Sequence, residues 1–305
     1  MEYLMLLGGL AGLFFGGESL VRGSVGIARK LSMSSLLIGL TVVGFGTSTP
    51  ELLVSLDAAL RGVPDIALGN VIGSNIANIL LIVGVSAVVW PIVVSGGTLV
   101  RDTAVMLGAA AVLVPFFALG DLGRVAGGFM FAALIGYLVF AYRQSRSEPA
   151  SSTDLPEAVS NVWLSIVWVV AGLAMLMVGA HYLVDGAVTI ARTFGVSEAF
   201  IGLTIVAVGT SLPELATSLI AALKKQSEIA IGNIIGSNIF NILGILGLTA
   251  VVSPIPVADR FLMFDLPVMI AVSIGLTLML RRPQIGRIPG IIMLVLYAGY
   301  VWAAQ

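Results

Sequence analysis

Two acidic residues with matching surroundings are the first candidates for chemistry in this sequence. Glu51 directly follows a proline in GTSTPE, and Glu214 directly follows one in GTSLPE. Both are predicted to lie near the middle of long apolar segments, where an ionised carboxylate is costly unless it has a partner. A cation is the natural partner, so we expect the two glutamates to bind one.

Further oxygen atoms are expected beside each carboxylate. Pro50 and Pro213 lack a backbone N–H and interrupt the helix, while Gly46 and Gly209 permit an irregular backbone, so carbonyl oxygens can face inward. Nearby hydroxyl groups belong to Thr47, Ser48, Thr210 and Ser211. These are hard ligands, and calcium accepts about six to eight of them in flexible geometry, whereas magnesium gives up its water reluctantly. Sodium also prefers oxygen, so one site can serve both ions in turn.

A second motif adds polar side chains to another pair of predicted helices. It reads GNVIGSNIANI from Gly69 and GNIIGSNIFNI from Gly232. Its polar residues recur every fourth position and share one helical face: Asn70, Ser74 and Asn78, and Asn233, Ser237 and Asn241. Alone, such a face more often serves helix packing. Two such faces meeting two broken helices would enclose both carboxylates and many neutral oxygens.

Both motifs belong to an internal repeat with an offset of 163 residues. IGLTVVGFGTSTPELLVS from Ile38 matches IGLTIVAVGTSLPELATS from Ile201 at 12 of 18 positions, and the next block matches at 14 of 19. Each copy is predicted to contain five membrane spans. Because five is odd, the second copy must enter the membrane in the opposite orientation, which is the inverted-topology repeat of secondary transporters.

The composition is that of a membrane protein. Hydrophobic residues make up 58% of the 305 residues, charged residues 10%, and the mean hydropathy is +1.09. The fold class we expect is an all-α polytopic membrane protein of ten transmembrane helices. The predicted spans are 4–27, 35–60, 66–90, 102–119, 125–142, 162–190, 199–223, 229–252, 263–280 and 288–303. Eleven of the 15 Lys and Arg residues then fall on one side, so both termini are expected outside.

The chain divides into two halves joined by a linker. We expect an N-terminal five-helix repeat over 1–143 with its motif at 38–84, and a C-terminal inverted repeat over 161–305 with its motif at 201–247. The segment 144–160, rich in Ser, Pro and charge, reads as a flexible cytoplasmic linker. The net charge of −1 and the absence of cysteine favour neither a nucleic-acid partner nor a thiolate metal site. We expect no cofactor and no obligatory protein partner, only the lipid bilayer.

The paired motifs resemble those of the calcium/cation antiporter superfamily, specifically its prokaryotic sodium/calcium exchanger branch. The resemblance implies location in the prokaryotic inner membrane and exchange of Na⁺ for Ca²⁺ by alternating access at a shared midplane site. It implies a site built from Glu51, Glu214, Thr47, Thr210, Ser48, Ser211, Ser74, Ser237, Asn78 and Asn241, with the backbone carbonyls of Gly44 and Ala207 serving sodium. Asn241 stands where some relatives have aspartate, which argues against potassium co-transport.

Other interpretations are open at this point. Coupling to protons or to another cation is the main alternative, although the GNxxE pattern of the proton-exchanger branch is absent. A channel would use similar oxygens, and an intramembrane hydrolase would need catalytic residues that the sequence does not offer. Two local expectations remain. Most of the aspartates at or close to predicted helix ends are expected to be solvated, namely most of Asp57, Asp65, Asp121, Asp259 and Asp265. Gly8, Gly12 and Gly16 are expected to form one smooth packing face.

Overall fold

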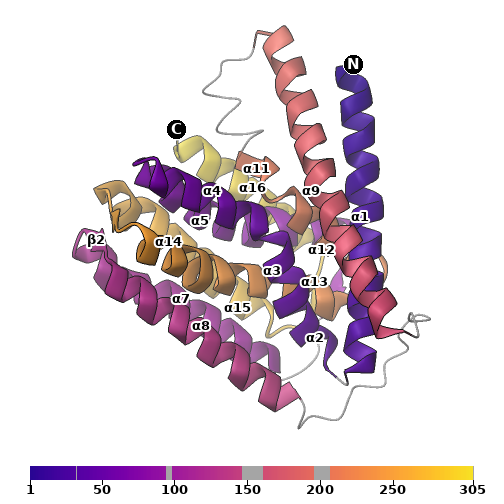
Figure 1. The fold of residues 1–305 in the computed structure, drawn as a ribbon, viewed down its shortest axis with the longest axis horizontal. Helices are drawn as coiled ribbons and strands as arrows, with labels where there is room; N and C mark the ends of the chain where they lie inside the picture. The colour runs from indigo at the N-terminus through magenta and orange to yellow at the C-terminus, as the bar shows by residue number, and fades with distance from the viewer. Residues whose placement is uncertain (32, 94–97, 146–160, 196–206, 305) are drawn as a thin grey trace.

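The computed structural model describes residues 1–31, 33–93, 98–145, 161–195 and 207–304, and this part of the chain is almost entirely helical. Figure 1 shows the arrangement. The first half contains α1 (Glu2–Lys30), α2 (Ser35–Ile38), η1 (Gly39–Val43), α3 (Gly44–Thr47), α4 (Thr49–Leu60), α5 (Pro64–Ala77), η2 (Asn78–Ile82), α6 (Val83–Val89), α7 (Thr98–Ala118) and α8 (Arg124–Ser145). The second contains α9 (Val162–Thr193), α11 (Ala207–Gly209), α12 (Leu212–Leu223), α13 (Ser227–Ile239), η4 (Phe240–Leu246), α14 (Gly247–Val252), η5 (Phe261–Asp265), α15 (Leu266–Met279) and α16 (Arg287–Ala303).

The apolar helices coincide with the predicted spans. Seven of the described helices are long and apolar enough to cross a membrane, and the bent pair Ser35–Thr47 and Thr49–Leu60 makes an eighth when it is taken as one span. The predicted spans 199–223 and 288–303 coincide with two shorter apolar helices, Leu212–Leu223 and Arg287–Ala303. The start of the former span, the first residues of the motif 201–247 and most of the linker 144–160 lie outside the described residues.

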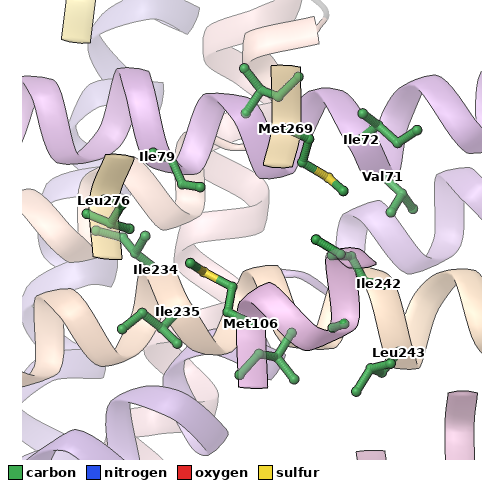
Figure 2. Close-up of a cluster of buried hydrophobic side chains, with 14 of the residues drawn as sticks. Val71, Ile72, Ile79, Met106, Ile234, Ile235, Ile242, Leu243, Met269 and Leu276 are labelled. Carbon is green, nitrogen blue, oxygen red and sulfur yellow. The ribbon is translucent and has the colours of Figure 1, made fainter. Parts of the chain in front are cut away.

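Two helical segments form the centre of the molecule. Pro64–Val89 and Ser227–Val252 have 78% and 83% of their apolar windows buried, against 22–39% for the five other long helices. Figure 2 shows part of the apolar cluster that these segments form with α7 and α15. Both segments carry the repeated Asn/Ser motif, and most of its polar side chains are buried.

The two halves interlock through equivalent contacts. Helix α8 packs against α14, and α16 packs against α6, so the last helix of each half covers the third segment of the other. Four two-residue strands add antiparallel pairs: β1 (Ile92–Val93) with β4 (Gln284–Ile285), and β2 (Asp121–Leu122) with β3 (Ile255–Pro256). These pairs are related by the 163-residue offset, so the repeat in sequence is also a repeat in contacts.

Helices α1 and α9 form a closely packed antiparallel pair that extends beyond the other helices (Figure 1). Glycines allow this approach, because a Cβ placed at Gly16 would lie 2.8 Å from the backbone nitrogen of Leu176 and 2.9 Å from the carbonyl oxygen of Gly172. The prediction that Gly8, Gly12 and Gly16 form the packing face of α1 was partly wrong. Gly12 faces α9, but Gly8 is exposed, and Gly9 takes its place in the contact.

Candidate cation-binding site

A break in the helix positions each glutamate. In the first half α3 ends at Thr47 and α4 begins at Thr49, with a bend of 45° at Ser48. Pro50 occupies the first turn of α4, where its missing N–H is tolerated, and Glu51 follows it. The second half repeats this local structure, because α12 begins after Ser211, whose φ of −89° and ψ of 7° match the −83° and 9° of Ser48.

Crossed hydrogen bonds join the two broken helices. Ser48 Oγ donates to Glu214 Oε1 at 2.9 Å, and Ser211 Oγ donates to Glu51 Oε1 at 3.4 Å. Each serine therefore binds the glutamate of the other half, and the expected meeting of the two GTSxPE motifs is observed.

The two carboxylates are buried without a compensating positive charge. Glu51 and Glu214 are each 1% exposed, and neither forms an ion pair within the described residues. The Oε2 atom of each has no hydrogen-bond partner there. An ionised carboxylate in a dry interior costs several kcal/mol unless it is paired, so this arrangement is suited to a cation. Two ionised carboxylates would balance the charge of one divalent ion.

Asn70 and Asn233 hold the broken helices in place. Asn70 Nδ2 donates to the Glu51 carbonyl at 3.0 Å and to Ser55 Oγ at 2.9 Å. Asn233 Nδ2 makes the equivalent bonds to the Glu214 carbonyl at 3.3 Å and to Ser218 Oγ at 2.8 Å. These two amides fix the backbone at the glutamates. Asn70 and Asn233 therefore have a different role from the other polar residues on the same helical faces.

Most of the remaining expected residues lie on helices that pack against α4 and α12, the helices that carry the glutamates. Ser237 Oγ donates to the Gly44 carbonyl at 3.2 Å, and Thr47 Oγ1 lies 3.2 Å from Asn233 Oδ1, so both contacts cross the repeat interface. Ser74 is 5% exposed. Thr210 lies between α11 and α12. Ala207 is the first residue of α11, and only the backbone of Ala207 is described.

Asn78 and Asn241 supply further buried oxygens. They are 1% and 0% exposed, and the Oδ1 atom of each has no hydrogen-bond partner among the described residues. Unpartnered amide oxygens in a buried site are unusual, because most buried polar groups are bonded. With the carboxylates and hydroxyls they make an oxygen-rich set of the kind that Ca²⁺ and Na⁺ accept.

The sequence reasoning missed Asn75 and Asn238, the last residues of the repeated GSN triplets. Both are 1% exposed, and Asn238 Oδ1 accepts a hydrogen bond from Asn78 Nδ2 at 3.1 Å. Their exact repetition in both halves was the available signal. The periodicity argument passed over them because they lie off the four-residue spacing of the polar face.

Asp265 is the exception among the five aspartates near predicted helix ends, because the other four are exposed as expected. It is 2% exposed, and it accepts hydrogen bonds from Arg260 Nε at 3.2 Å and from the Tyr300 hydroxyl at 3.0 Å. Tyr137 and Asp102 form the repeat-equivalent pair, with the hydroxyl 3.1 Å from Asp102 Oδ1. The last helix of each half covers this carboxylate, so a position near a helix end is buried.

Known proteins share both the sequence pattern and the fold. The family described as sodium/calcium exchanger protein matches residues 1–143 and 164–304. The sodium/calcium exchanger MaX1 of Methanosarcina acetivorans is 34% identical over 99% of this chain and 97% of its own length. The inner membrane protein YrbG of Escherichia coli is 37% identical over 99% of this chain and 95% of its own length.

A solved structure extends the similarity to three dimensions. The sodium-calcium exchanger NCX_Mj, soaked with Na⁺ and Ca²⁺, matches with a TM-score of 0.86 and 34% identity over 100% of this chain and 98% of that chain. The family match covers nearly all of both halves, including the two broken helices and their glutamates. The chain therefore belongs to the sodium/calcium exchanger family.

Proposed function

We propose that the protein exchanges Na⁺ for Ca²⁺ across the prokaryotic inner membrane by alternating access, with Glu51 and Glu214 as the shared ligands of both ions. The observation that carries the proposal is the pair of buried carboxylates joined by crossed serine bonds, each with one oxygen that has no hydrogen-bond partner among the described residues. A divalent ion neutralises the charges of both carboxylates, and sodium ions that bind the same oxygens displace it. Mutually exclusive occupancy of one site couples the two fluxes.

The proposed ligand set is the one that the family resemblance implies. It comprises Glu51, Glu214, Thr47, Thr210, Ser48, Ser211, Ser74, Ser237, Asn78, Asn241 and the carbonyls of Gly44 and Ala207. Support comes from the burial of the described side chains and from the contacts that cross the repeat interface. Ten helices in two inverted five-helix repeats, with both termini outside, complete the proposed topology.

Uptake of radioactive calcium into sodium-loaded proteoliposomes tests this proposal. An outward sodium gradient should drive calcium inward, while matched sodium on both sides should not. Uptake that requires a pH gradient and ignores sodium would favour proton coupling instead. A flux that does not depend on the ion on the opposite side would indicate a channel.

A further inference from the structure

Amide ligands carry an orientation problem that carboxylates do not. The side chain of Asn78 or Asn241 has one oxygen, which can bind a cation, and one NH₂ group, which repels it. An amide that is free to rotate therefore presents the wrong atom part of the time. A hydrogen bond from the NH₂ group to a fixed acceptor would keep the oxygen available to the ion.

Asn78 has such an acceptor. Its Nδ2 donates to Asn238 Oδ1 at 3.1 Å, which leaves its own Oδ1 buried and unpartnered. Asn238 is itself held, because its Nδ2 donates to Met106 Sδ at 3.6 Å. The chain Met106–Asn238–Asn78 thus runs from the apolar cluster of Figure 2, where Met106 is drawn, to the cation site.

The equivalent chain in the other half is present in sequence but is not formed. The 163-residue offset relates Met106 to Met269, Asn238 to Asn75 and Asn78 to Asn241. Asn75 Nδ2 donates instead to the Val71 carbonyl at 2.7 Å. Among the described residues, Asn75 Oδ1 and both polar atoms of the Asn241 side chain have no partner.

Resting on the proposed function, we propose that Asn238 and Asn75 are positioning residues that orient the ligands Asn78 and Asn241 in alternate conformations of the transporter. Alternating access in an inverted-repeat transporter moves one part of the protein against the other around a fixed site, and in this proposal the two halves exchange their local hydrogen bonds between the access states. The Asn78–Asn238 bond belongs to the state described here. In the opposite state this bond opens, and Asn241 Nδ2 donates to Asn75 Oδ1. Each asparagine pair therefore sets calcium affinity on one side of the membrane.

Sided transport measurements test this assignment with a matched pair of variants, Asn238→Leu and Asn75→Leu. Purified protein is reconstituted, the fraction in each orientation is determined, and KM for Ca²⁺ is measured separately at the two faces. Loss of one orienting bond to a buried amide should raise KM about five- to thirtyfold. Asn238→Leu should raise it at one face, and Asn75→Leu at the other. A purely structural role would alter both faces together.

A double-mutant cycle separates orientation from packing. In an Asn78→Ala background the orienting role has no target, so Asn238→Leu should change KM by less than about twofold. If Asn238→Leu folds poorly, Met106→Leu removes only the sulfur contact that holds Asn238. Met106→Leu should raise KM at the same face as Asn238→Leu, by a smaller factor.

The outcomes distinguish this inference from the proposed function. The positioning role is overturned if the wild type exchanges sodium for calcium but the two variants raise KM at the same face or not at all. The proposed exchange function would stand in that case. Equal effects of Asn238→Leu with and without Asn78 also overturn it. If the wild type shows no sodium-driven calcium uptake, both the proposed function and this inference are wrong.

Discussion

Replacing Glu51 with glutamine should separate ion binding from folding. Glutamine keeps an oxygen that can accept the hydrogen bond from Ser211 Oγ, so the crossed contact between the broken helices persists. The substitution removes one buried charge that has no ion pair among the described residues. It breaks no charge pair and relieves repulsion from Glu214, so we expect the ion-free protein to be at least as stable as the wild type.

Calcium binding should weaken strongly. A divalent ion about 4 Å from a unit charge interacts with it by about 8 kcal/mol at an effective dielectric constant of about 20, twice the value for two unit charges. Part of this is offset because a neutral side chain costs less to bury, so a net loss of about 3–4 kcal/mol corresponds to an affinity roughly two to three orders of magnitude lower. At about 100 times the wild-type Kd, calcium stabilises the wild type by about 2.7 kcal/mol. For the variant the same concentration gives about 0.4 kcal/mol or less.

Thermal unfolding in detergent, with and without calcium, measures both quantities in one experiment. Asp265→Asn is the matched control, because Asp265 is also a buried carboxylate but it pairs with Arg260 and Tyr300. Arg260 is 55% exposed and can be solvated, so this variant should lose about 1 kcal/mol of stability while keeping the calcium-induced increment.

The reasoning fails if Glu51→Gln retains the wild-type calcium increment or normal exchange in proteoliposomes. It also fails if Asp265→Asn loses the increment, since that would place the calcium site elsewhere.

Two further substitutions probe the helix pair and the selectivity of the site. Gly16→Ala should destabilise the protein by about 1–3 kcal/mol relative to Gly8→Ala. Only the methyl group at position 16 would collide with Leu176 and Gly172 across the α1–α9 contact. Equal Tm values for the two variants would contradict this packing. Asn241→Asp should alter ion selectivity or the pH dependence of exchange more than the Tm, because it adds a third carboxylate to a buried site. A lower Tm with unchanged selectivity and an unchanged pH profile would instead indicate a packing role.

Local sequence was sufficient to predict the membrane class and the helix breaks beside the two glutamates. The apolar composition leaves few alternatives to a bundle of spanning helices. The Pro and Gly residues around Glu51 and Glu214 act on the backbone within one helical turn, so the breaks could be predicted without tertiary information. The repeat identified the equivalent residues in the two halves. The family resemblance was confirmed over nearly the whole chain.

Contacts between distant segments were beyond such reasoning. The crossed bonds of Ser48 and Ser211 depend on how two halves pack, and the burial of Asp265 depends on α16, which follows it in the chain. The face of α1 that contacts α9 was also misjudged by one position, because Gly8 and Gly9 are equally suited to close packing until a partner helix is placed.

The difference between Asn238 and Asn75 shows this limit most clearly. Both stand in the same GSN triplet, and local sequence predicts the same behaviour for both. Of the two, only Asn238 accepts a hydrogen bond from an asparagine of the other half, because equivalent residues in the two halves occupy different surroundings in one conformation. Sequence determined which residues are equivalent in the two halves, whereas tertiary structure decided which of them are in contact, since side-chain hydrogen bonds depend on the placement of segments far apart in the chain.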